Sequence, residues 1–235
     1  KPINEKKINK ISLTPLEQQY LKDKKQINMC IDPNWMPFEA FDKKGAHIGL
    51  TTDYFNIFRK ELSIPINVIK TKTWSQTLQF AQDRKCDILS LVIKTKERQK
   101  YLDFTAPYFD TSYVLATKPN ISFINNLENL RNVKIGILKG SAFNETLRNN
   151  YPSITLIDVK NIEEGLQKVT TGEFFGFIDS FATIGYLLQT KFLGELSISG
   201  KFKEHFELGI AVRNDDPILL DILNSVIINL PFDTK

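Results

Sequence analysis

The sequence predicts an α/β fold with two open, mostly parallel sheets joined by two crossover strands, and three observations support this class. Apolar strand patterns alternate with amphipathic patterns of helical period, as in parallel βαβ units. The alternation restarts after Pro119, so two βα series share one chain. Apolar segments at 113–117 and 206–212 bracket the second series. If both cross between lobes, the second lobe is inserted in the first; the alternative is one continuous mixed sheet.

The first βα series follows a short helix. Thr14-Pro15-Leu16-Glu17 is a capping box with proline at the first helical position, and it predicts a helix from 15 to about 24. A small hairpin is expected across the turn residues 42–45. The other elements expected here are strands at 27–31, 39–41, 46–48, 66–70 and 87–93, and helices at 52–62 and 75–83.

The second series repeats this alternation from Val133 onward. Its expected strands lie at 133–138, 155–159, 174–178 and 208–212, and its expected helices at 140–149, 162–169, 180–189 and 217–230. Asp215 or Asp216 is placed to cap the last helix. We therefore expect lobe one to comprise residues 1–115 and 208–235, and lobe two to comprise residues 116–207.

Composition and charge argue against several classes of function. A chain of 235 residues that is 42% hydrophobic can bury one large core or two modest ones. Its 31 basic and 27 acidic residues are intermixed, without a basic stripe interleaved with aromatic residues, so nucleic-acid binding is not supported. No apolar run approaches the roughly 18 residues of a transmembrane helix. The sequence has no initiator methionine or signal peptide, and Lys1 is expected to begin a mature or trimmed fragment.

The cysteines and histidines form no metal-binding or catalytic pattern. Cys30 is expected late in one strand and Cys86 just before another, which would put them at opposite ends of a parallel pair, roughly 10 Å or more apart. Both are therefore predicted to be buried free thiols. His47 and His205 lack ligand spacing with either cysteine or with a carboxylate pair, and we interpret them as structural or surface residues. No cofactor is expected.

The segment from Ser90 to Phe109 carries the strongest functional signal. An apolar strand leads into a polar stretch with Arg98, whose guanidinium can hold a carboxylate with two hydrogen bonds. Ligands of open α/β sheets bind at such carboxyl ends of strands. The alternative is that Arg98 is one of several charges on a solvated helical turn between Lys94 and Lys100.

This segment, with Thr95, Arg98 and the run YLDFTAPY at 101–108, resembles the signature of the bacterial extracellular solute-binding proteins of family 3. Members of that family are bilobed Venus-flytrap amino-acid receptors of the periplasm. The resemblance covers nearly the whole chain from Ile27 onward, and it implies two lobes that close around a ligand by a hinge motion. It also implies that Arg98 clamps the α-carboxylate of the ligand.

Other residues match the same family. Gly140 and Ser141 begin a helix whose N–H groups and dipole suit an anion, and in the family this loop completes the carboxylate site from the second lobe. Asp179 resembles the acid that pairs with the α-ammonium of the ligand. An acid at the end of a strand can equally cap the next helix, here at Ser180.

Aromatic residues complete the implied site. Trp35 and Trp74 match two walls of the ligand slot, although tryptophans are more often simply core residues. Asp32 aligns with an acid that meets the distal cation of basic amino acids, and Asp-Pro is also an ordinary start of a loop. The full set of implied ligand-binding residues is Asp32, Trp35, Phe38, Trp74, Ser90, Val92, Arg98, Gly140, Ser141 and Asp179.

Two positions depart from the family pattern. Ile93 and Ala142 stand where family members often carry hydroxyl side chains that donate to the ligand carboxylate. Each missing hydrogen bond to a charged group is worth about 1.5–3 kcal/mol, or roughly a factor of ten to a hundred in affinity. The pocket is therefore expected to bind an amino acid weakly or to prefer another small carboxylate.

The implied function is extracytoplasmic binding of a small carboxylate-bearing metabolite, above all an amino acid, without catalysis. The segment 13–21 resembles flytrap domains that precede membrane-bound histidine kinases and diguanylate cyclases, so we expect a periplasmic sensor domain tethered to the inner membrane, with a membrane-anchored signalling module as partner. The alternative is a free binding protein that serves an ABC permease. A periplasmic dehydratase is less favoured, because an acid–base enzyme would have to rely on Asp32, Asp179 or Glu97 without a nearby histidine.

Overall fold

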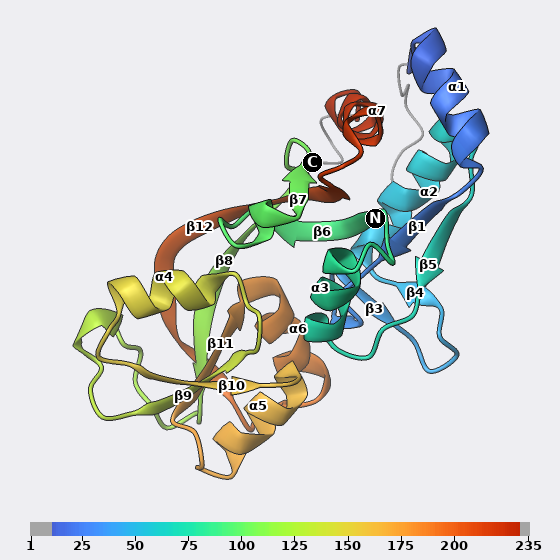
Figure 1. Cartoon of the computed structure of the whole chain (residues 1–235). Helices are drawn as coiled ribbons and strands as arrows, with labels where there is room; N and C mark the ends of the chain where they lie inside the picture. Colours follow the sequence, from blue (N-terminus) through green and yellow to red (C-terminus); the bar gives the residue numbers. More distant parts are fainter. Residues whose placement is uncertain (1–10, 231–235) are drawn as a thin grey trace.

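Two lobes joined by a pair of long strands make up the computed structural model, which describes residues 11–230 (Figure 1). The connecting strands are β8 (Phe109–Thr117) and β12 (Ser197–Arg213), which pair antiparallel over most of the length of β8. The strand order is β10-β9-β11-β8-β12-β6-β1-β5, so hydrogen bonds run without a break from one lobe to the other. The ladder is continuous because β8 and β12 belong to both lobes.

In the first lobe, β1 lies between β5 and β6 and is parallel to both. Every residue of β6 is buried, which explains its uninterrupted apolar sequence. The lobe contains α1 (Pro15–Lys24), β1 (Ile27–Cys30), α2 (Leu50–Leu62), β5 (Ile66–Ile69), α3 (Trp74–Gln82), β6 (Ile88–Ile93), the 3-10 turn η1 (Arg98–Lys100), β7 (Leu102–Phe104) and α7 (Pro217–Ile228). The capping box of α1 is confirmed, since Thr14 and Glu17 each bond the backbone N–H of the other.

A separate small sheet, in the order β2-β3-β4, hangs from the end of β1. The hairpin of β3 (Glu39–Phe41) and β4 (His47–Ile48) is confirmed, and β2 (Asn34–Trp35) is an addition that the sequence analysis did not predict.

In the second lobe, β9 lies between β10 and β11, parallel to both, and β11 is antiparallel to β8. The lobe contains the 3-10 turn η2 (Leu127–Asn129), β9 (Lys134–Leu138), α4 (Phe143–Asn150), β10 (Thr155–Val159), α5 (Ile162–Thr170), β11 (Gly176–Ser180) and α6 (Phe181–Thr190). β11 begins and ends two residues later than expected, so that Asp179 lies inside the strand.

The largest difference from the expected elements is the length of β12, which has 17 residues instead of the five expected at 208–212. Residues 201–207 alternate between exposed polar side chains and more buried ones, two of which are phenylalanines, and a search for apolar runs misses this half-buried strand pattern. The expected lobe boundaries after residues 115 and 207 fall within β8 and β12 and stay a prediction. The terminal parts of that prediction, 1–10 and 231–235, lie outside the described residues.

The prediction of two free thiols is wrong, because Cys30 and Cys86 form a disulfide with a Cα–Cα distance of 5.8 Å. Cys86 is not part of β6. It lies in the irregular connection between α3 and β6, and α3 packs against β1. This connection places Cys86 beside Cys30 rather than at the opposite end of the strand pair.

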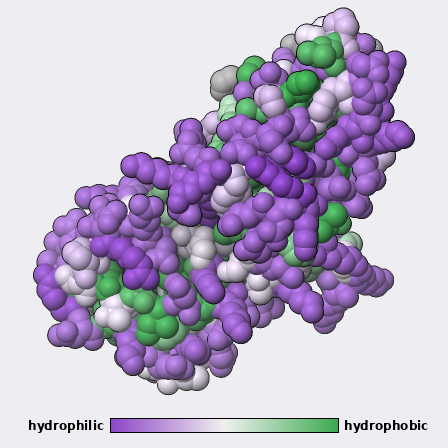
Figure 2. Space-filling view, viewed as in Figure 1, coloured by the Kyte–Doolittle hydropathy of each residue, from purple (hydrophilic) through white to green (hydrophobic). Residues whose placement is uncertain are grey.

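Polar side chains cover most of the face shown in Figure 2. The large apolar side chains with the greatest exposure are dispersed along the chain, among them Leu16 on α1, Phe123 and Leu193 in loops, and Ile228 on α7. None of the helices described for residues 11–230 combines the length and the apolar content of a membrane span.

Loss of the disulfide is expected to destabilise the protein. The bond closes a loop with a sequence separation of 56, for which the chain-entropy model gives about 4 kcal/mol of stabilisation. Replacement of Cys30 and Cys86 by alanine should lower the free energy of unfolding by about this amount, which urea titration measures as a lower midpoint. Reductant should then have no further effect on the variant. An unchanged midpoint would contradict this role of the disulfide.

Candidate functional site

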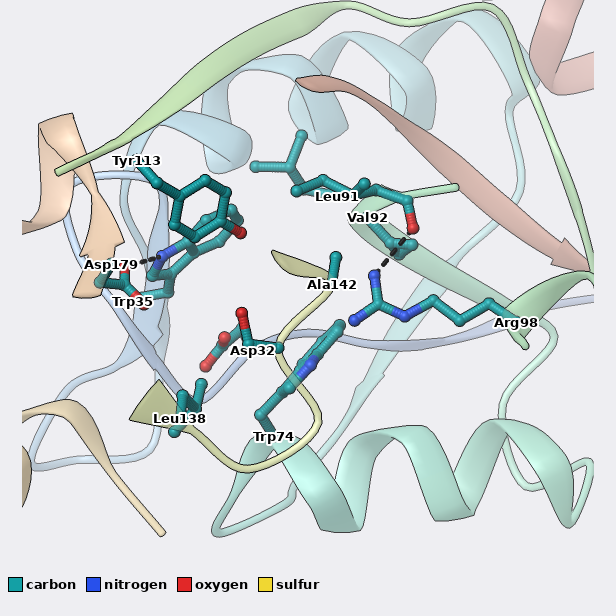
Figure 3. Close-up of a pocket in the computed structure, with 12 residues that line it drawn as sticks. Asp32, Trp35, Trp74, Leu91, Val92, Arg98, Tyr113, Leu138, Ala142 and Asp179 are labelled. Atoms are coloured by element: carbon teal, nitrogen blue, oxygen red, sulfur yellow. Dashed lines mark hydrogen bonds between the residues drawn. The ribbon is translucent and has the colours of Figure 1, made fainter. Parts of the chain in front are cut away.

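A cavity of about 40 Å³ lies between the lobes, at the carboxyl ends of β1, β6 and β9 (Figure 3). This is where open α/β sheets hold their ligands. The lining residues are Asp32, Trp35, Trp74, Leu91, Val92, Ile93, Arg98, Tyr113, Leu138, Ser141, Ala142 and Asp179. In the view of Figure 3, Arg98 enters from one side, Asp179 lies on the opposite side, and Asp32 lies between them.

Arg98 is buried, with 5% of its surface exposed, so the alternative of a solvated helical turn is excluded. Its Nη1 donates to the carbonyl of Ile93 at 2.8 Å, and its Nη2 donates to the carbonyl of Gly140 at 2.9 Å. The guanidinium also lies 5.4 Å from the ring centroid of Trp74. Among the described residues, no carboxylate lies within salt-bridge distance of Arg98. The charge is thus held only by neutral carbonyl groups and an aromatic face.

Gly140 brings its carbonyl to Arg98 through a turn that needs glycine. Its φ is +82°, a conformation that side-chain-bearing residues rarely adopt, and an added Cβ would lie 3.2 Å from Leu78 and 3.5 Å from Trp74. The turn ends β9 and precedes α4, so the contact between Arg98 and Gly140 links the two lobes. Ser141, next in the chain, lines the cavity.

Two buried acids face Arg98 across the cavity. Burial, together with the neighbouring Asp179 carboxylate, raises the pKa of Asp32 to about 7, against the opposing effect of its hydrogen bond with the Asn34 backbone. Burial likewise raises the pKa of Asp179 to about 6, against the opposing effect of its hydrogen bonds with Ser180 and Trp35. The cavity therefore combines one permanent positive charge with two acids that ionise near neutral pH.

The two tryptophans also connect the lobes. Trp35 Nε1 donates to Asp179 Oδ2 at 3.2 Å, and Trp74 Nε1 donates to the carbonyl of Gly140 at 3.3 Å. Each tryptophan belongs to the first lobe and each acceptor to the second. Both line the cavity, on different sides of it (Figure 3).

Two predicted site residues lie behind the cavity wall. Phe38 packs against Trp35, with ring centroids 4.5 Å apart, and does not line the cavity. The hydroxyl of Ser90 points away and donates to Glu39 Oε1 at 2.5 Å. The neighbour of Ser90, Leu91, lines the cavity instead. The part that each of the predicted residues takes in ligand binding remains a prediction.

Sequence reasoning missed Glu39, which is fully buried beneath the loop that carries Asp32. Its Oε2 accepts from the backbone N–H of Asp32 at 2.7 Å, and its Oε1 accepts from the Thr51 hydroxyl at 3.0 Å as well as from Ser90. His47 Nε2 lies 2.9 Å from that Thr51 oxygen, a structural role as expected. Nothing in the strand pattern of 39–41 marked a buried carboxylate.

Sequence reasoning also missed Tyr113, Leu91 and Leu138 as lining residues. Tyr113 pairs with Ser180 across β8 and β11, which puts its buried ring beside Asp179. Only the register of these two strands brings Tyr113 into the cavity, and a register between strands more than 60 positions apart leaves no local signal in the sequence. Among the described residues, no cluster of three or more His, Cys, Asp or Glu residues could hold a metal ion.

Comparisons with known proteins bear on the family and the fold of the chain. The sequence model of the bacterial extracellular solute-binding proteins, family 3, matches residues 27–234. ABC transporter arginine-binding protein 1 of Escherichia coli is 23% identical over 88% of this chain and 86% of its own length. The virulence sensor protein BvgS of Bordetella bronchiseptica is 18% identical over 92% of this chain, which corresponds to 18% of that protein. The crystal structure of the BvgS periplasmic VFT2 domain of Bordetella pertussis superposes with a TM-score of 0.87 and 18% identity, over 95% of this chain and 96% of that domain.

We expect Asp32→Asn to change how stability depends on pH. The pKa of Asp32 is raised in the folded protein, so folding favours the protonated carboxyl group. Its contribution to the free energy of unfolding is complete below about pH 4 and is lost as the pH rises through about 7. Asparagine keeps an oxygen for the Asn34 N–H, which donates to Asp32 Oδ1, and it does not ionise. The free energy of unfolding of the variant should exceed that of the wild type by an amount that grows from pH 4 to 7. Urea titrations across this range measure the difference, and a gap independent of pH would contradict the assignment.

Proposed function

Since the chain belongs to the bacterial extracellular solute-binding proteins, family 3, we propose that it binds a small carboxylate-bearing metabolite, above all an amino acid, by closing its two lobes. The observation that carries this proposal is the buried guanidinium of Arg98, which has no carboxylate partner among the described residues and faces two buried acids. We propose that Arg98 takes the ligand carboxylate and Asp179 the ammonium.

The charges of the cavity support a ligand that carries a cationic group on its side chain in addition to its ammonium group. With Asp32 and Asp179 ionised, the site carries one net negative charge, and an amino acid with a neutral side chain leaves this charge in place. A cationic side chain directed at Asp32 would balance it. The relative from Escherichia coli named as an arginine-binding protein agrees with this class of ligand.

Ligand entry requires the lobes to separate. The cavity of about 40 Å³ is much smaller than the roughly 150 Å³ that accommodates benzene in a protein core. We propose that β8 and β12 act as the hinge and that the bonds of Trp35 to Asp179 and of Trp74 to Gly140 break and re-form around the ligand. The ligand carboxylate then replaces one of the two carbonyl groups that accept hydrogen bonds from Arg98. A charged acceptor makes a stronger hydrogen bond with the guanidinium than a neutral carbonyl does.

We propose that the domain is the extracytoplasmic sensor of a membrane-anchored signalling receptor. The similarity in fold to one BvgS domain over nearly its full length supports this role. The disulfide between Cys30 and Cys86 supports an oxidising compartment outside the cytoplasm. The full-length gene tests the proposal, because a transmembrane helix and a kinase or cyclase module after residue 235 would agree with it.

The second candidate function is delivery of an amino acid to an ABC permease, which the similarity to a transport protein favours. A gene that ends near residue 235 and encodes a lipid-anchored or exported protein beside a permease gene would support it over a sensor. We propose no catalytic step for either role.

Arg98→Ala is expected to abolish binding of the cognate amino acid. The variant leaves the ligand carboxylate desolvated and unpaired, which costs several kcal/mol, or at least about a hundredfold in affinity. Calorimetry on a ligand found by a thermal-shift screen of amino acids and small organic acids measures the loss. Lys100→Ala, on the same turn and exposed, serves as the control and should bind like the wild type. Wild-type affinity in the Arg98 variant would exclude the proposed anchor.

We expect binding of an amino acid to strengthen as the pH rises from about 5 to about 8. Asp179 and Asp32, with pKa values of about 6 and about 7, lose their protons in this range and then attract the ammonium group, whereas Arg98 stays charged throughout. Calorimetric titrations at intervals of half a pH unit measure the dissociation constant. An affinity that is constant or falls over this range would contradict the role of the two acids.

A further inference from the structure

Tyr113 brings a phenol hydroxyl into the cavity from β8, one of the two strands that join the lobes. The residue keeps only 4% of its surface exposed. In the view of Figure 3, its hydroxyl points away from the strand and toward the side of the cavity from which Arg98 enters. The phenol therefore lies on the route between the two charged ends of the site.

The ring of Tyr113 is held against the second lobe. It stacks on Phe143, with ring centroids 4.6 Å apart, and meets Phe206 edge-on at 5.4 Å. Its backbone pairs with Ser180. Phe143 begins α4 and Ser180 ends β11, both in the second lobe, so the hydroxyl keeps its place relative to that lobe.

Hydrogen-bond donors are scarce in the lining of the cavity. The indole N–H groups of both tryptophans already donate across the cleft. The only alcohol and phenol groups in the lining belong to Ser141 and Tyr113, and the remaining members, Arg98 apart, are apolar or acidic. These two hydroxyls are thus the neutral donors that a ligand meets beside the guanidinium of Arg98.

The neighbours of Tyr113 leave its proton directed at the cavity. The Ser141 hydroxyl is its hydrogen-bond neighbour, and Ser141 Oγ already accepts from the backbone N–H of Phe143 at 3.3 Å. Ser141 can therefore donate its own proton to the phenol oxygen. The hydrogen bonds of Asp32 and Asp179 come from other groups, so neither acid takes the phenol proton. A bound anion would supply the acceptor.

The phenol stays neutral while the two acids of the cavity ionise. Burial, together with Asp179 and Asp32, raises the pKa of Tyr113 above its ordinary range, against the opposing effects of Ser141 and Arg98. Burial lowers the pKa of Arg98, and Tyr113 opposes this more than Asp32 does. The phenol oxygen is thus within electrostatic reach of the guanidinium, and an anion bound to Arg98 meets an O–H donor at every pH near neutrality.

We propose that the Tyr113 hydroxyl donates a hydrogen bond to the ligand carboxylate held by Arg98 and so selects ligands that carry this group. The inference rests on the proposed function, since it gives the same carboxylate a second donor. Arg98 belongs to the first lobe, whereas Tyr113 is packed against the second. The carboxylate therefore joins the lobes, and the bond with Tyr113 forms on closure.

The test compares L-arginine with agmatine, which is L-arginine without its carboxylate. Tyr113→Phe removes the hydroxyl and keeps the ring on Phe143, so the variant should fold like the wild type. It should bind L-arginine roughly ten- to a hundredfold more weakly in calorimetry, because a hydrogen bond to a charged group is lost, and release it faster in stopped-flow measurements. Its affinity for agmatine should equal that of the wild type.

Tyr186→Phe, on α6 and outside the lining of the cavity, is the matched control and should bind both probes like the wild type. If another amino acid of the thermal-shift screen binds in place of L-arginine, its decarboxylated amine replaces agmatine. Binding of the amino acid that depends on Arg98 but not on Tyr113, or equal weakening of both probes by Tyr113→Phe, would overturn the inference and leave the proposed function in place. A wild type that binds no amino acid would refute the proposed function, and the inference with it.

Discussion

The buried guanidinium of Arg98 is the constraint on which the arrangement of the two lobes depends. A charge removed from water must be compensated, and here the compensation comes from the carbonyl groups of Ile93 and Gly140. Ile93 ends a strand of the first lobe, whereas Gly140 lies in a turn of the second. Separation of the lobes takes the Gly140 carbonyl away, and the guanidinium must then find water or an anion. In the proposed role, the same group favours closure and binds the ligand carboxylate.

In the proposed mechanism, the closed arrangement and the ligand compete for the same donors. The Trp35 and Arg98 side chains make hydrogen bonds across the cleft, to Asp179 and Gly140, that a bound amino acid would replace or share. A ligand shifts such an equilibrium only by the difference between its affinities for the two states. In a signalling domain, contacts that close the lobes without a ligand set the fraction of closed molecules at rest, and the ligand shifts that fraction. In a transport protein, the same contacts would lower the apparent affinity for cargo.

The sequence was sufficient for the order of the elements and for the residues that carry charge in the cavity. Local patterns such as the capping box at Thr14 depend on neighbouring residues, and they were predicted closely. Arg98, Asp179 and Trp35 were found through a resemblance between motifs, and all three side chains line the cavity. The assignment of Ser90 to the cavity was less accurate, because the side chains of a strand alternate between faces and its hydroxyl points to Glu39.

Features that depend on contacts between distant segments were missed. Tyr113 reaches the cavity through the register of β8 with β11. The Cys30–Cys86 disulfide was wrongly excluded because the expected distance assumed two ideal parallel strands. Cys86 in fact lies in the irregular connection that precedes β6. None of these features is encoded in a short window of sequence.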